Sequence, residues 1–128
     1  MDKQGKGRLG EDAVCSELIR RGHKILARNY RKPFGEIDII SEHDGCIVFT
    51  EVKTRKYGSM VSGVEAVDRR KQAKIIVTAD RYLTENQPEL QPRYDIAEVE
   101  ITRGDFPRII GIRIYEAAFT TDGVYTVN

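Results

Sequence analysis

The chain has 128 residues, of which 40% are hydrophobic and 32% charged, and its formal net charge is +1. This length is typical of one domain with a buried core, and no apolar run approaches the length of a membrane span. We therefore expect a single domain over 1–128, with a core over about 8–119 and a weakly patterned tail over 120–128. The start of the chain has no apolar signal core, and the two cysteines lack metal-ligand spacing, which predicts a cytoplasmic protein without a membrane partner.

Charge is distributed unevenly along the chain. Residues 1–32 carry nine Lys and Arg against four Asp and Glu, and residues 53–74 carry seven against two. The remaining residues carry five against fourteen. A polyanion that approaches an acidic, cation-binding site between basic segments fits this distribution. Solvated helix faces that are simply basic fit the charge pattern equally well.

The first predicted element is an amphipathic helix over about 8–21. Its apolar stripe follows helical spacing and consists of Glu11, Val14, Cys15, Leu18 and Ile19. The stretch 5–10 spells a GxGxxG string without a preceding strand, so we interpret it as a flexible basic leader rather than a dinucleotide site. Glu11 either leans toward a site in the core or is a first-turn residue stabilised by the helix dipole.

Three strands are expected next, over 23–31, 36–42 and 46–55. Asp44-Gly45 separates the last two, and Asp-Gly between alternating hydrophobic residues predicts a type I′ hairpin. The two histidines, which fall near predicted turns, are interpreted as solvated loop residues.

The hairpin turn fixes which residues are opposite one another. With Asp-Gly as the turn, opposite residues have numbers that add to 89, so Asp38 faces Glu51 and Glu36 faces Lys53. Opposite side chains share a face, and two carboxylates placed this way repel each other unless one pKa rises, a cation binds or Lys53 offsets their charge. The pattern therefore predicts a metal site, with two solvated carboxylates as the alternative.

A long helix is expected over about 64–84. Its buried stripe is predicted to be Asp68, Gln72, Ile75, Ile76, Ala79 and Leu83. An amide on an apolar stripe needs hydrogen-bond partners. Gln72 is therefore either a residue that reaches the site or a substrate phosphate, or a satisfied core amide.

Two further strands are predicted over 93–102 and 108–115, and 116–128 is weakly patterned. The expected order is one helix, three strands, a long helix and two strands. This order predicts an α/β fold with a mixed central sheet flanked by helices.

Several short motifs occur together in a characteristic order. Gly35-Glu36-Ile37-Asp38 followed by Glu51-Val52-Lys53 resembles the PD-(D/E)xK motif of the restriction-endonuclease-like superfamily, although Ile37 replaces the usual Pro. The set also includes Gly10-Glu11-Asp12-Ala13, Asn29-Tyr30-Arg31, Arg93-Tyr94-Asp95 and Ala118-Phe119. Over about 5–119 the chain is similar to the YraN/UPF0102 family. The resemblance implies an αβββαβ core and kinship with archaeal Holliday-junction resolvases.

The resemblance also implies a site and an activity. The site would comprise Glu11, Asp38, Glu51 and Lys53. Gln72, which the helix pattern suggests and the resemblance does not, is a further candidate. Mg²⁺ or Mn²⁺ would bind Asp38, Glu51 and the Val52 carbonyl. The expected function is that of a metal-dependent endonuclease which hydrolyses phosphodiester bonds of structured or branched DNA, with DNA preferred over RNA, and which acts as a homodimer. The alternatives are a non-catalytic nucleic-acid-binding protein that retains the fold, and a partner-binding domain with a structural ion-pair network.

Overall fold

The computed structural model describes residues 1–60, 62, 64 and 66–122. Within these residues lie two helices and five strands: α1 (Lys3–Arg20), β1 (Lys24–Lys32), β2 (Gly35–His43), β3 (Cys46–Lys56), α2 (Arg69–Asn86), β4 (Gln91–Ile101) and β5 (Ile109–Phe119). This order confirms the predicted one. Among the described residues, neither helix is long and apolar enough to cross a membrane.

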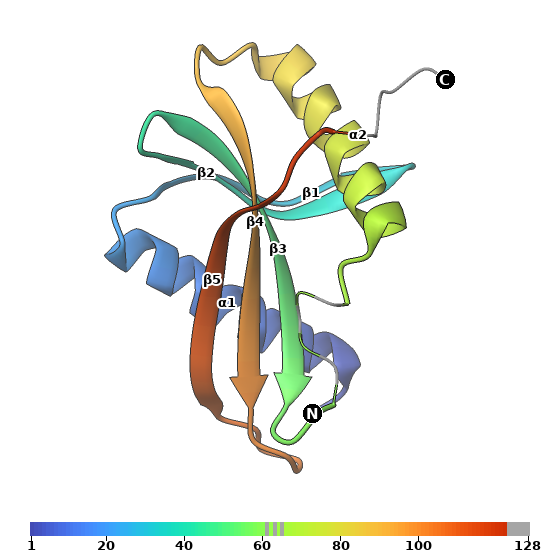
Figure 1. Cartoon of the computed structure of the whole chain (residues 1–128). Helices are drawn as coiled ribbons and strands as arrows, with labels where there is room; N and C mark the ends of the chain where they lie inside the picture. The colour runs from blue at the N-terminus through green and yellow to red at the C-terminus, as the bar shows by residue number, and fades with distance from the viewer. Residues whose placement is uncertain (61, 63, 65, 123–128) are drawn as a thin grey trace.

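The five strands form one mixed sheet in the order β1-β2-β3-β4-β5. β3 and β4 are parallel and the other neighbouring pairs are antiparallel. Parallel strands need a long crossover connection, and α2 lies in it. The arrangement confirms the predicted restriction-endonuclease-like αβββαβ core with a mixed sheet and flanking helices (Figure 1).

Each helix packs on its own face of the sheet. Ile75, Ile76 and Ala79 of α2 share a core with residues of β2, β3 and β4. A second core joins Val14 and Leu18 of α1 to other residues of β2 and β4. Because successive strand residues point to opposite faces, the two clusters give a layered structure with the sheet in the middle.

α1 begins at Lys3, five residues before its predicted start, so the prediction of a flexible leader is wrong. Asp2 caps the helix, since its Oδ1 accepts a hydrogen bond of 2.7 Å from the Gly5 N–H. The cap satisfies a terminal N–H and offsets the poor helix propensity of the glycines that follow.

Gly10 brings α1 close to β3. A Cβ at this position would lie 2.0 Å from Thr54 Oγ1. The missing side chain therefore allows a close approach, which sets the neighbouring Glu11 beside the hairpin.

α2 begins at Arg69 rather than at 64, because Asp68 is its N-cap. Asp68 Oδ1 accepts a hydrogen bond of 2.9 Å from the Lys71 N–H, and Asp68 is exposed. The prediction of Asp68 on the buried stripe is therefore wrong. Ile75, Ile76 and Ala79 are buried as predicted, whereas Gln72 and Leu83 are half-buried. Residue 65 of the predicted range lies outside the described residues.

β5 continues to Phe119, four residues beyond its predicted end, and the Phe119 ring stacks on Tyr94 at a centroid distance of 5.3 Å. The Ala117 N–H donates to Asp95 Oδ1 at 3.0 Å, which ties this end of β5 to β4. Of the predicted weakly patterned stretch, 123–128 lies outside the described residues.

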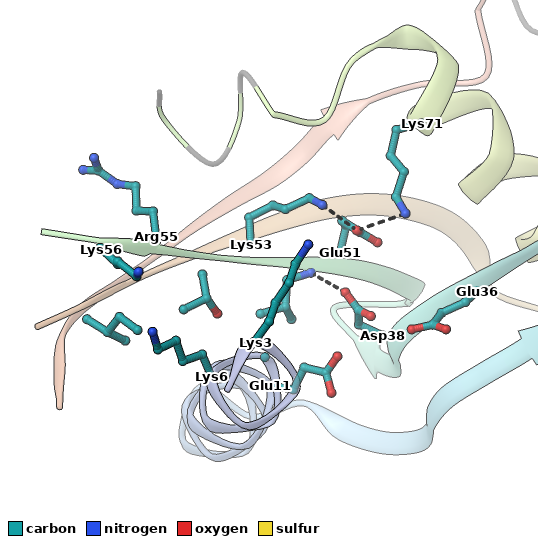
Figure 2. A pocket seen from close by; sticks show the side chains of 14 residues that line it. Lys3, Lys6, Glu11, Glu36, Asp38, Glu51, Lys53, Arg55, Lys56 and Lys71 are labelled. Carbon is teal, nitrogen blue, oxygen red and sulfur yellow. Dashed lines mark hydrogen bonds and ion pairs between the residues drawn. The ribbon is translucent and has the colours of Figure 1, made fainter. Parts of the chain in front are cut away.

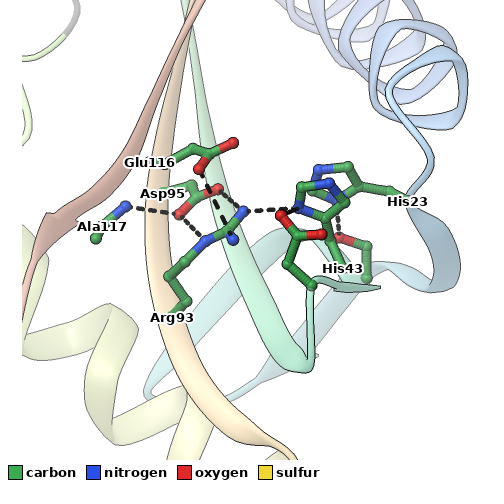
Figure 3. Close-up of polar contacts among 8 residues, drawn as sticks. His23, His43, Arg93, Asp95, Glu116 and Ala117 are labelled. Atoms are coloured by element: carbon green, nitrogen blue, oxygen red, sulfur yellow. Dashed lines mark hydrogen bonds and ion pairs between the residues drawn. The ribbon is translucent and has the colours of Figure 1, made fainter.

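A polar cluster near the turn of the β2–β3 hairpin contains both histidines (Figure 3). The His23 and His43 rings stack at a centroid distance of 3.9 Å, and His23 is only 6% exposed. His23 Nδ1 lies 2.8 Å from Ser41 Oγ, and Arg93 Nη2 lies 3.4 Å from His43 Nδ1. The prediction of solvated loop histidines is therefore wrong, because tertiary packing covers residues that are near turns in sequence.

Candidate functional site

A pocket of about 560 Å³ lies between α1, β3 and the first turn of α2. Figure 2 shows the charged side chains that line it. Five predicted site residues contribute to its wall: Glu11, Asp38, Glu51, Val52 and Lys53. The sequence thus identified most of the acidic part of this pocket.

The hairpin register is the predicted one over its paired length. Ile39 is opposite Thr50 and His43 is opposite Cys46, so the numbers add to 89. The pairing ends at Ile39 and Thr50, one position before Asp38 and Glu51. Beyond that point, the Val52 N–H donates to Asp38 Oδ2 at 2.7 Å. The two acids therefore flank the place where β2 and β3 separate, and they are not a directly opposed pair of the ladder.

Asp38 belongs to a cluster of three carboxylates. One oxygen of each of Glu11, Glu36 and Asp38 lies within 4.8 Å of the others. Glu36 was not predicted as a ligand. It is opposite Arg31 of β1 rather than Lys53, and its Oε2 lies 3.0 Å from Arg31 Nε. Its spacing of two residues from Asp38 on one strand was the available sequence signal.

Three acids of the pocket, Glu11, Asp38 and Glu51, bind protons more readily than usual. Burial, followed by the charge of Asp38, raises the pKa of Glu11 to about 7. Burial and then the same charge raise the pKa of Glu51 to about 7, against the opposing charges of Lys71 and Lys53. Burial also raises the pKa of Asp38, although the Val52 N–H opposes this. Asp38 is 7% exposed and Glu51 5% exposed, and such burial disfavours their ionised forms. A bound cation would favour the ionised forms instead.

Glu51 lies between two ammonium groups. Its Oε1 is 3.5 Å from Lys53 Nζ and 3.6 Å from Lys71 Nζ. Lys71 was not predicted, because the expected start of α2 at 64 gave no particular role to 71. Recognition of Asp68 as the N-cap would have placed Lys71 in the first turn, where the helix dipole disfavours a cation.

Gln72 does not line the pocket. Its Nε2 donates to the Val67 carbonyl at 3.0 Å. The structure therefore shows a satisfied amide at the start of α2, one of the two alternatives that the sequence left open, and not a side chain that reaches the carboxylates.

The fold is of the restriction-endonuclease-like class, and it carries a pocket lined by carboxylates. Residues 10–99 match the family described as "Uncharacterised protein family UPF0102". The chain is 42% identical to a UPF0102 protein of Syntrophotalea carbinolica over 118 residues, which cover 91% of this chain and 93% of the relative. It is 35% identical to a UPF0102 protein of Moorella thermoacetica over 120 residues, which cover 93% and 98%. The chain belongs to the UPF0102 family, which confirms the resemblance seen in its motifs.

Proposed function

We propose that this protein is a metal-dependent nuclease that hydrolyses phosphodiester bonds of structured or branched DNA. The main support is the meeting of Glu11, Glu36 and Asp38 within 4.8 Å in the same pocket as Glu51 and Lys53. Asp38 is buried and the other two carboxylates are half-buried, and carboxylates gathered in this way repel one another unless a proton or a cation offsets their charge. A pocket that holds these acids together with Lys53 has the groups that metal-assisted hydrolysis needs.

The donor set fits Mg²⁺ or Mn²⁺, because carboxylate oxygens are hard ligands. We assign the cation to Asp38 and Glu51, with the Val52 carbonyl as a third ligand. Glu11 and Glu36, whose carboxylates lie close to that of Asp38, would orient water bound to such a cation. A bound divalent cation would acidify a water and neutralise charge on the phosphate.

The lysines beside Glu51 act on the substrate. When Glu51 serves as a ligand, the ammonium groups of Lys53 and Lys71, now 3.5 and 3.6 Å from it, can pair with phosphate oxygens. Lys53 orients the attacking water or stabilises negative charge that develops on the phosphate. Lys71 binds the phosphate from the side of α2.

The first test is cleavage of a panel of single-stranded, flapped and four-way-junction DNA and RNA, each with Mg²⁺ and with Mn²⁺. We expect cleavage of structured DNA by the natural protein and at least a hundredfold loss in Asp38→Asn. Asp12→Asn is the matched control, because Asp12 of α1 lies outside the pocket and pairs with Arg28 of β1. Equal cleavage by Asp38→Asn and the natural protein would contradict the assignment.

Calorimetric titration with Mn²⁺ helps to distinguish a nuclease from a non-catalytic nucleic-acid-binding protein and from a partner-binding domain. If the protein is a nuclease, we expect it to bind Mn²⁺. Asp38→Asn should abolish this binding, and Glu51→Gln should weaken it at least tenfold. DNA binding without cleavage under any divalent metal would instead indicate a non-catalytic binding protein. No metal binding at all would indicate a partner-binding domain.

A further inference from the structure

The two ends of the pocket carry opposite charge. Glu11, Glu36 and Asp38 gather at one end, whereas Lys6 of α1 and Lys56 of β3 lie at the other (Figure 2). Lys3, one helical turn before Lys6, also lines the pocket. The proposed metal binding uses the carboxylates of the acidic end. It does not involve the lysines of the basic end.

Other cations near this end are already engaged. Arg55 Nε and Nη2 lie 3.1 and 2.9 Å from carboxylate oxygens of Glu98 and Glu100, and its Nη1 donates to the Ser59 carbonyl. The Arg103 Nε donates to the Tyr57 carbonyl at 2.9 Å.

Lys3, Lys6 and Lys56 differ from these arginines, because no carboxylate among the described residues lies within ion-pair distance of them. Lys6 and Lys56 also crowd each other, and the neighbouring Lys6 ammonium group lowers the pKa of Lys56. Like charges placed together in this way repel and favour an anion between them.

Two features of α1 bring Lys3 and Lys6 to β3, where Lys56 lies. The Asp2 cap extends the helix back to Lys3, and Gly10 lets the helix approach Thr54 closely. Gly7 also lines the pocket, and a Cβ there would meet nothing within 4 Å, so the space at this turn of α1 is open. The positive end of the α1 dipole adds to the charge of the lysines.

We propose that Lys3, Lys6 and Lys56 form a phosphate-binding subsite for the nucleic-acid strand whose adjacent phosphodiester lies at the acidic end. This inference rests on the proposed nuclease function and gives it a direction: the strand crosses the pocket along β3, from the carboxylates to the first turn of α1. The phosphate is either internal to the strand or a terminal monoester, and the two sources share the same chemistry.

The test measures DNA binding by fluorescence anisotropy in EDTA, where metal-dependent cleavage does not occur. The probes are single strands of about 20 nucleotides with a 5′-phosphate or a 5′-hydroxyl, titrated over about 50–200 mM salt. We expect Lys6→Ala/Lys56→Ala to weaken binding at least tenfold and to reduce the slope of log affinity against log salt by about 1.4, two phosphate contacts on a single strand. The control Lys24→Ala, in β1 outside the pocket, should bind like the natural protein.

The outcomes distinguish an internal phosphate from a terminal one, and the phosphate subsite from the nuclease function. An equal loss on both probes indicates an internal phosphate, and a loss only on the 5′-phosphorylated strand indicates a terminal one; both support the subsite. Unchanged affinity and salt slope in the double variant, or no binding by the natural protein, would overturn it. If the double variant weakens binding but no substrate is cleaved, the subsite stands and the nuclease proposal fails. If cleavage occurs but the double variant binds normally, only the subsite fails.

Discussion

Glu51 is a buried carboxylate whose charge opposes folding in the metal-free protein. Its pKa rises from 4.5 to about 7, chiefly because of burial. The folded state therefore holds a proton that the unfolded state releases above pH 4.5, so this group lowers stability as pH rises from 4.5 through 7. We predict that Glu51→Gln, which removes the charge but keeps the shape, raises the free energy of unfolding at pH 8 by about 1–3 kcal/mol.

Urea unfolding in EDTA at pH 5 and pH 8 measures this effect. The gain should shrink toward pH 5, where Glu51 of the natural protein is mostly protonated. Glu17→Gln is a control that should change the free energy of unfolding in the opposite direction, because hydrogen bonds from Arg20 and Arg21 lower the pKa of Glu17 to about 2. A Glu51→Gln protein that is less stable than the natural one at pH 8 would refute the account of burial as the dominant effect.

At the scale of the element, the contact between α1 and β3 places Glu11, Lys3 and Lys6 in the pocket. We predict that Gly10→Ala destabilises the protein by about 1–2 kcal/mol, because the added Cβ would lie 2.0 Å from Thr54 Oγ1 and force the helix or the threonine to shift. Thermal or urea unfolding measures the change. Gly7→Ala is the matched control in the same helix, where alanine should instead stabilise by about 0.5–1 kcal/mol.

A double-mutant cycle identifies the cause. Thr54→Ala removes the hydroxyl oxygen, after which the nearest remaining atom is the Thr54 Cβ at 3.4 Å. Gly10→Ala should therefore cost less in the Thr54→Ala background, with a coupling of at least about 0.5 kcal/mol. Additive effects of the two substitutions would show that the loss comes from another contact.

The elements also show which features of the sequence carry local information. Asp44-Gly45 fixed the hairpin register correctly, because both residues have the positive φ that the turn needs and the signal lies within a few residues. Both helix starts were misplaced, because capping by Asp2 and Asp68 competes with glycine content and apolar spacing. Consequently Glu11, which lies on a clear stripe, was found, whereas Lys71 depends on a cap and was missed.

At the scale of the whole molecule, the site depends on contacts between distant segments that periodicity does not encode. Glu36 and Lys71 come from β2 and α2, and their convergence on β3 follows from the sheet order and the crossover helix. The motif residues Arg93 and Asp95 were recognisable in the sequence, but their partners were not. Their paired side chains hold the β4–β5 end of the sheet and reach His43 of the hairpin (Figure 3).

This second cluster predicts a pH dependence of global stability opposite in sign to that of Glu51. Burial, then the charges of His43 and Arg93, lower the pKa of His23 to about 4, against an ordinary 6.5. Between these values the unfolded chain binds more protons than the folded protein. The stabilisation is therefore complete above pH 6.5 and is lost as pH falls toward 4, by at most about 1.4 kcal/mol per pH unit. In His23→Asn, whose side chain can still hydrogen-bond Ser41, this contribution should disappear. Urea unfolding from pH 5 to 7 should then show a smaller gain in stability with pH for the variant than for the natural protein, and parallel curves would mean that His23 is protonated equally in both states.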